Sequence, residues 1–147
     1  MKTHHKVISV QTEECLQFID LTEEVEKVVE ESGIKNGLVN VQTNHTTAML
    51  TLNENEPLLI EDMKEHLDLI SPIDKEYRHD NFEVRTVNMC DDECANGHSH
   101  CKALHLNSNL TLNLLEGKIQ FGTWQRVMFI ELDRTRPRKV QTMIIGE

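Results

Sequence analysis

The residues of this sequence best suited to chemistry are three histidines in separate segments and a charged group near the C-terminus. The charged group follows an apolar run and consists of Glu131, Asp133, Arg134, Arg136, Arg138 and Lys139. Neutral imidazoles suit zinc and similar divalent ions, and three of them leave an open position for catalysis. Guanidinium groups match the oxygens of phosphates and carboxylates. We therefore expect His45, His79 and His100 to meet these carboxylates and arginines in one site.

Two carboxylates alternate along the end of the apolar run, so Glu131 and Asp133 are expected on one face of a strand. A carboxylate among apolar residues is costly to bury alone, so it must be paired or functional. The alternative is a surface network of ion pairs with the neighbouring arginines. Trp124, the only tryptophan, is expected in the core or in the wall of a pocket.

A second histidine arrangement competes for a metal. Cys90, Cys94, His98, His100 and Cys101 place three thiols and two imidazoles in a short stretch. The two-residue gap typical of a zinc knuckle is absent, and no second cysteine pair follows. A structural zinc site and free thiols both stay open here.

Composition limits the classes of function. The formal net charge of -10 disfavours a nucleic-acid binder, which needs a basic face. No apolar run reaches the roughly 18 residues of a membrane span, and the N-terminus does not resemble a signal peptide, so we expect a cytoplasmic protein without a membrane partner. In that compartment cysteines are thiols or metal ligands. A chain of 147 residues fits one domain, 1–147.

The elements that must position these residues alternate between strands and helices. Strands are predicted over 6–10, 38–42, 47–52, 110–115, 119–121, 123–132 and 140–145. A helix is predicted after Asp20, which with Glu23 forms a capping box, and it ends at Ser32-Gly33. A second helix starts at Pro57 and runs to about Ile70, and a third covers 95–106.

The last two strands are predicted to pair as a hairpin through the Arg-Pro turn region. Residues 71–95 are polar and irregular, and such a stretch inside a compact domain is usually functional or mobile. Short loops and late strands without crossover helices favour an α+β fold: one compact, sandwich-like domain with a mostly antiparallel or mixed sheet and a few packed helices.

At several of these positions the sequence resembles the YjbQ-like family, identified as secondary thiamine-phosphate synthase enzymes. The resemblance covers nearly the whole chain. It is carried by His45-Thr46-Thr47-Ala48, Asn53-Glu54-Asn55, Tyr77-Arg78-His79, Asn96-Gly97-His98-Ser99-His100, Gly122-Thr123-Trp124-Gln125, Glu131-Leu132-Asp133 and Arg136.

The resemblance implies a homotrimer with sites near subunit contacts. It also implies an activity that joins a hydroxymethylpyrimidine pyrophosphate to a thiazole phosphate and releases pyrophosphate. His45, His79 and His100 fall on the family's histidines. The other recurrent positions are matched by Glu54, Trp124, Gln125, Asp133 and Arg136.

From this resemblance and the residue types we expect Glu54, Asp133 and Arg136 to be catalytic. Trp124, Gln125 and Arg138 are expected to bind substrate, with the three histidines binding a divalent ion, zinc or magnesium, or binding phosphate directly. Two other functions stay open: a metal-dependent hydrolase of a small phosphorylated metabolite, and a non-catalytic trimeric binding protein.

The sequence departs from the family pattern at one turn. The family has Asp-Gly-Pro-Arg where this chain has Asp133-Arg134-Thr135-Arg136. Glycine is the residue that most easily takes a positive φ, so its loss predicts a reshaped turn and a different aim for Arg136. Cys101 replaces an apolar residue, and Cys90 and Cys94 are outside the pattern.

Overall fold

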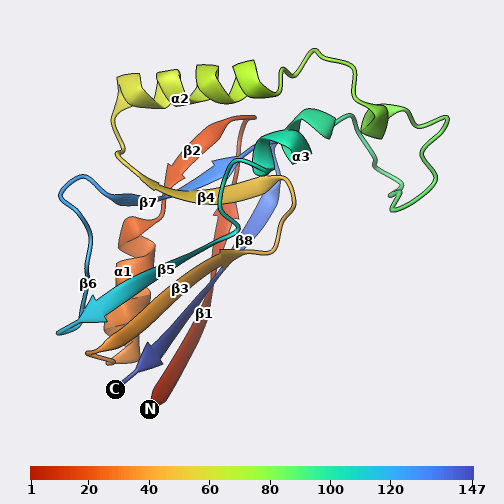
Figure 1. Ribbon diagram of the computed structural model, residues 1–147. Coiled ribbons are helices and arrows are strands. Elements are labelled where there is room, and N and C mark those ends of the chain that lie inside the picture. Colours follow the sequence, from red (N-terminus) through yellow and green to blue (C-terminus); the bar gives the residue numbers. More distant parts are fainter.

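Two antiparallel sheets and three α-helices build the molecule, and the computed structural model describes residues 1–147 (Figure 1). The larger sheet has the order β1-β8-β3-β5-β6, and the smaller has the order β2-β7-β4. The strands are β1 (Lys2–Gln11), β2 (Gln17–Asp20), β3 (Gly37–Thr43), β4 (Ala48–Asn53), β5 (Asn109–Leu115), β6 (Lys118–Ile119), β7 (Arg126–Glu131) and β8 (Pro137–Gly146). The expected α+β domain with two packed sheets is confirmed.

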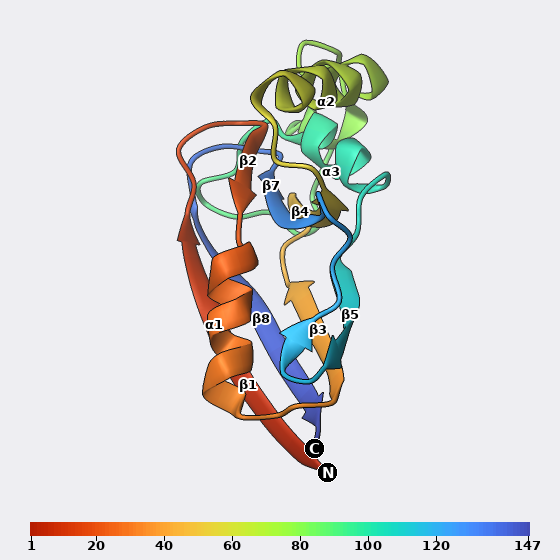
Figure 2. The same cartoon turned by 90° about the vertical axis from the view of Figure 1, so that its left-hand side faces the viewer.

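The first helix, α1 (Thr22–Ser32), lies against the larger sheet (Figure 2). Val25, Val28 and Val29 share its buried face, as their spacing predicts. The helix ends at Gly33 with φ 64°, as expected for a glycine in the left-handed conformation. This helix and the facing sheet enclose the main apolar core.

The predicted capping box is wrong. Leu21, not Asp20, is the residue flanking α1, and no side chain caps it in the expected way. The Asp20 carboxylate instead accepts the Thr22 N–H at 2.9 Å and forms an ion pair with Arg126 at 2.6 Å. The arginine holds Asp20 in the end of β2, a short strand that the sequence analysis missed because four residues are too few to show alternation.

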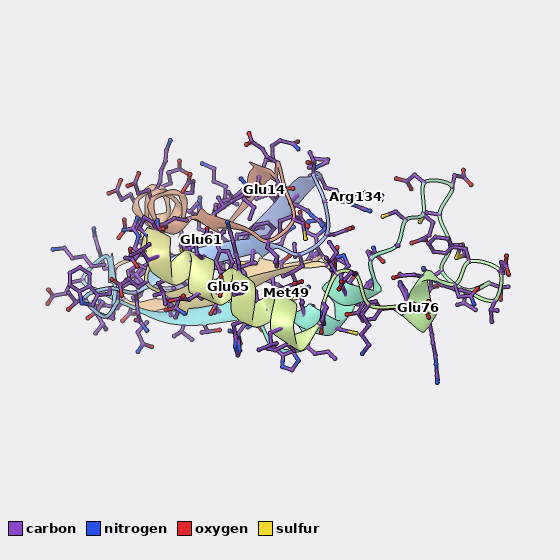
Figure 3. The ribbon with its side chains drawn as sticks, turned by 90° about the horizontal axis from the view of Figure 1, so that it is seen from above. Glu14, Met49, Glu61, Glu65, Glu76 and Arg134 are labelled. Atoms are coloured by element: carbon purple, nitrogen blue, oxygen red, sulfur yellow. The ribbon has the colours of Figure 1, made fainter.

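The other helices, α2 (Pro57–Ile70) and α3 (Gly97–Ala103), lie over the smaller sheet, with a 3-10 helix, η1 (Arg78–Asp80), in the connection between them (Figure 1). Pro57 starts α2 as predicted, and Glu56 caps it through the backbone N–H groups of Leu58 and Leu59. Figure 3 shows Glu61 and Glu65 on α2 and Glu76 in the long connection that extends away from the sheets. None of the helices combines the length and the apolar character needed to cross a bilayer.

A buried lysine joins α3 to the end of α2. Lys102 is fully buried, and its Nζ donates to the Ser71 carbonyl and lies 3.3 Å from Asp68 Oδ1. A buried ammonium needs such partners, since an unpaired charge in the interior is costly. The third helix is shorter than the predicted 95–106 because residues 104–106 form turns.

The predicted hairpin of the last two strands is wrong. Strand β7 pairs with β2 and β4, whereas β8 pairs with β1 and β3 in the other sheet. The reason is burial: residues 127–132 are buried on both faces of the sheet, so β7 is a central strand with a neighbour on each side. After Leu132 the chain crosses from one sheet to the other.

One ion pair joins the two sheets at this crossing. Arg138 Nε donates to Glu131 Oε2 at 2.6 Å, and Arg138 Nη2 donates to Glu131 Oε1 at 2.5 Å. Both side chains are almost fully buried. Thr12 Oγ1 and the Asp133 N–H also donate to the carboxylate, at 2.9 and 3.0 Å. The predicted pairing of Glu131 is confirmed, as a buried pair and not as a surface network.

We predict that Arg138→Met destabilises the protein by about 3–5 kcal/mol, because it leaves the Glu131 charge buried without its partner. The double variant Glu131→Leu/Arg138→Met should be less destabilised than the single one. Lys6→Met, which removes the exposed 2.7 Å pair with Glu31, is the matched control and should change stability far less, because solvent screens the pair. Urea denaturation measures all three, and equal losses for Arg138→Met and Lys6→Met would contradict the assignment.

Candidate functional site

A cavity of about 840 Å³ lies where the two sheets meet the long connection between α2 and α3. Its walls come from the β3–β4 loop, η1, the 85–93 loop, the start of α3 and the turn between β7 and β8. The ionisable lining residues are Arg78, Arg85, Arg136, Arg138, His45, His79, His100, Cys90, Asp92 and Glu93. The structure therefore brings together the three predicted histidines, Arg136 and Arg138.

The three imidazoles do not surround one point. The rings of His79 and His100 are in edge contact, with centroids 4.7 Å apart and planes at 66°. His45 Nε2 accepts the Lys139 N–H at 3.0 Å, so its lone pair is already engaged. No group of three or more His, Cys, Asp or Glu residues is arranged to hold a metal ion. In this arrangement the three histidines do not form a binding site for the expected zinc or magnesium ion. Whether the protein binds such an ion stays a prediction.

The competing cysteine and histidine arrangement does not form a metal site either. Cys90, Cys94 and Cys101 are free thiols, and they do not join His98 or His100 in a metal-binding cluster. His98 is buried, and its Nδ1 lies 3.2 Å from Ser99 Oγ. This places His98 in the packing of α3 and outside the cavity.

Two of the cavity histidines are kept neutral by their surroundings. Burial, and after it the positive charge of Arg138, lowers the pKa of His45 below its usual value. Burial, and after it the neighbouring His79, lowers the pKa of His100. Neutral imidazoles accept and donate protons and hydrogen bonds near pH 7. His100, whose ring is in edge contact with His79, can therefore accept a hydrogen bond or a proton in the cavity.

Four arginines line the cavity, but they differ in how much of their charge is already paired. Arg138 is held by Glu131 and by Thr47 Oγ1 at 3.1 Å, and Arg85 is paired with Glu93 at 3.3 Å. Arg136 Nη2 lies 3.2 Å from Asp133 Oδ2, with about a third of its side chain exposed. Arg78 is exposed and forms none of the ion pairs of the chain. Arg78 and Arg136 are thus the cations most available to a ligand.

The turn that aims Arg136 is shaped by Thr12. The Thr12 backbone N–H donates to the Arg136 carbonyl at 3.1 Å, and the Arg136 N–H donates to Thr12 Oγ1 at 2.9 Å. No residue from Asp133 to Arg136 has a positive φ. The turn therefore accommodates Arg134 and Thr135 where the family pattern has glycine and proline. Arg134, labelled in Figure 3, is part of this turn, and its Nη2 donates to the Asp92 carbonyl at 3.2 Å.

The remaining predicted site residues lie at the opposite end of the molecule. Glu54 follows β4, and Trp124 and Gln125 lie in the β6–β7 connection, both far from the 71–96 connection in Figure 1. Asp20 joins these segments, because it binds both Asn55 and Arg126. Trp124 is 69% exposed, so its expected place in the core or a pocket wall is wrong in the single chain. Within one chain these residues do not join the cavity.

Arg85 was not among the predicted site residues, yet it organises the wall of the cavity. Its guanidinium donates to the backbone carbonyls of His79, Val87 and Asn88, at 3.4, 3.3 and 2.7 Å, and binds Glu93. An irregular loop leaves backbone carbonyls without regular partners, and a side chain can supply the donors. Arg85 is the only basic residue between Asn81 and Asn96, which is the signal that could have identified it.

We predict that Arg85→Ala loosens the 86–93 segment, because three carbonyls and one carboxylate lose their shared donor. Hydrogen exchange of amides in this segment should become faster, while exchange in the sheets stays unchanged. Arg126→Ala removes an ion pair at the other end of the molecule and should leave the segment as in the wild type. Unchanged exchange in Arg85→Ala would show that the segment is held by other contacts.

The whole chain is similar to known proteins in both sequence and structure. The family model described as "UPF0047 protein YjbQ-like" matches residues 6–147. A UPF0047 protein of Methanothermobacter thermautotrophicus is 33% identical over all of this chain and 95% of its own length, and one of Archaeoglobus fulgidus is 35% identical over 90% of this chain and 94% of its own. A solved YbjQ-like protein of unknown function from Sulfolobus solfataricus superposes with a TM-score of 0.86 at 33% identity, covering 99% of each chain. A hypothetical protein of Aeropyrum pernix gives 0.86 at 32% identity over all of both chains.

Proposed function

This chain belongs to the YjbQ-like UPF0047 family, and from that premise we propose that it binds a small phosphorylated metabolite in the cavity and acts on it as an enzyme. The observation that carries the proposal is the charge of the cavity. The chain has a formal net charge of -10, yet the cavity lining holds four arginines against two carboxylates, Asp92 and Glu93. A local excess of cations in an acidic protein favours an anionic ligand.

The phosphate is assigned to Arg78 and Arg136. Both line the cavity, and neither is fully engaged by a carboxylate. Guanidinium groups bind phosphate oxygens with two parallel hydrogen bonds, which fixes orientation as well as charge. Asp133 positions Arg136, and Arg138 acts through the fold by pairing with Glu131. This changes the expected role of Arg138 from a substrate ligand to a structural one.

The reaction proposed for the site is of the thiamine-phosphate synthase kind, in which a pyrimidine pyrophosphate alkylates a thiazole phosphate. A carbon–nitrogen bond forms, the carbon–oxygen bond to the pyrophosphate breaks, and the bonding electrons leave on the pyrophosphate. Arg78 and Arg136 would stabilise the negative charge that develops there. The His79–His100 pair would hold or move a proton near the reacting groups. No step is assigned to a metal ion.

Hydrolysis of a small phosphorylated metabolite is the second candidate function. It is favoured by the contact between the two neighbouring imidazoles, because a neutral His100 can accept a proton from an attacking water. A binding protein without turnover is the third outcome, and it would need the arginines but not the imidazoles.

We predict that pyrophosphate binds the purified protein and that Arg78→Ala or Arg136→Ala weakens binding about ten-fold or more, since hydrogen bonds to charged groups contribute about 1.5–3 kcal/mol. Isothermal titration calorimetry measures this, and Lys6→Ala, which removes a cation on β1 outside the cavity, is the control. Equal affinity in all four proteins would remove the cavity as the anion site.

Turnover separates the three candidate functions. Synthesis of thiamine phosphate from the two substrates, lost in His100→Gln, supports the synthase, and release of phosphate from single substrates supports the hydrolase. Tight binding without either product leaves the binding protein. Each assay is run with and without a chelator, which tests the predicted metal ion separately.

The same proposal includes a homotrimer in which one chain's Glu54–Trp124 end completes the cavity of the next. Trp124 is a large apolar side chain with 69% exposure, which is typical of a surface that another chain covers. Glu54 carries a negative charge, which is complementary to a cationic cavity. We also place the protein in the cytoplasm, which the four free cysteines support.

Mixed oligomers test the shared site. Arg136→Ala and Trp124→Ala are each expected to reduce activity strongly, whereas co-expressed, mixed oligomers should regain part of it, because some sites then receive both intact residues. Size-exclusion chromatography with light scattering gives the number of chains. Activity in the mixture equal to the mean of the two variants would show that each site is built from one chain.

A further inference from the structure

Two buried polar atoms beside the cavity have no hydrogen-bond partner. One is the side-chain oxygen of Asn96, Oδ1, an acceptor, and the other is Nε of Arg136, a donor. Asn96 is 7% exposed, and both residues line the cavity. Leaving a buried donor or acceptor unpaired is costly, so native proteins rarely do so without a functional reason.

The two side chains are fixed close together by one carboxylate. Asn96 Nδ2 donates to Asp133 Oδ2 at 3.4 Å, and Arg136 Nη2 lies 3.2 Å from the same oxygen. The backbone N–H of Asn96 is also held, by Asp80 Oδ1 at 2.9 Å. Through these contacts Asp133 holds the unpaired acceptor, Asn96 Oδ1, and the unpaired donor, Arg136 Nε, in one small region.

We propose that Asn96 and Arg136 form a subsite for the organic part of the ligand, and that this part carries an N–H donor next to an acceptor, as along the edge of a primary amide or an aminated heteroaromatic ring. The ligand N–H donates to Asn96 Oδ1, and its acceptor receives the Arg136 Nε–H. The proposal rests on the function given above and adds to it the class of group beyond the phosphate.

The geometry assigns two tasks to the sides of Arg136. The side chain is about a third exposed, and its terminal Nη groups contribute to the phosphate site with Arg78. Its buried Nε instead binds the neutral group. Both unpaired atoms are closed to solvent in the present conformation, so the proposal requires the side chains to move and open them to the cavity. A site built to pair a donor and an acceptor discriminates strongly against analogues that lack either, because its own groups are then left unpaired.

Matched phosphates test the subsite. The first has a terminal primary amide, the second the methyl ester of the same acid, which keeps the acceptor and lacks the donor, and the third an alkyl chain with neither. Each is made with one, two and three methylenes between the phosphate and the terminal group, and binding is measured by calorimetry with inorganic pyrophosphate as the reference.

At the best spacing we expect the amide to bind about three- to ten-fold more tightly than the ester and the ester more tightly than the alkyl phosphate, given typical hydrogen-bond contributions. Asn96→Ala should abolish the preference for the amide over the ester while pyrophosphate affinity changes less than about three-fold. Arg136→Lys keeps the charge but lacks Nε–H, so it should abolish the preference for the ester over the alkyl phosphate. Asn44→Ala, at an exposed cavity residue, is the matched control and should keep both preferences.

The outcomes separate this inference from the proposed function. Equal affinity for the three phosphates at every spacing, with pyrophosphate still bound, overturns the subsite and leaves the anion cavity intact. No binding of any phosphate or of pyrophosphate overturns both. Thermal unfolding shows whether each variant is folded. If Asn96→Ala does not fold, Arg136→Lys still tests the subsite.

Discussion

The buried pair between Glu131 and Arg138 is the interaction on which the rest of this structure depends. Each residue comes from a different sheet, and the pair lies where β7 ends and the chain crosses to β8. The carboxylate also receives hydrogen bonds from Thr12 and from the Asp133 backbone. A charge pair buried so completely tolerates little movement, because neither partner can be left alone in the interior.

This constraint extends to the cavity through the turn that follows Glu131. The turn is tied at one end to the carboxylate and at the other to Thr12, so the intervening Asp133 and Arg136 have fixed positions. Asp133 in turn holds Asn96 and Arg136 beside each other. A structural ion pair thus determines where Arg136 lies. Arg85 has the corresponding role for the opposite wall, where no regular element holds the backbone.

The elements that could be predicted from sequence are those with a strong local signal. The face of α1, its glycine end and the proline start of α2 follow from residue type and spacing, and so does the pairing of Glu131. The prediction of a hairpin was wrong because two strands that are consecutive in the chain can lie in different sheets. The local pattern of apolar residues does not show which strands pair with each other. The convergence of His45, His79, His100 and Arg136 on one cavity was predicted, but the engagement of the His45 lone pair depends on a backbone N–H from a distant strand. Trp124 shows the same limit, since its aromatic side chain predicts burial, yet it is 69% exposed in the chain.

The central claim is that an acidic protein keeps a cationic cavity whose most available charges are Arg78 and Arg136. A crystal structure of the protein with pyrophosphate tests it most directly. The account predicts the anion in the cavity, with its oxygens within hydrogen-bond distance of both guanidinium groups and with Arg138 still paired to Glu131. Pyrophosphate bound elsewhere, or bound by Arg138 with the Glu131 pair broken, would contradict it.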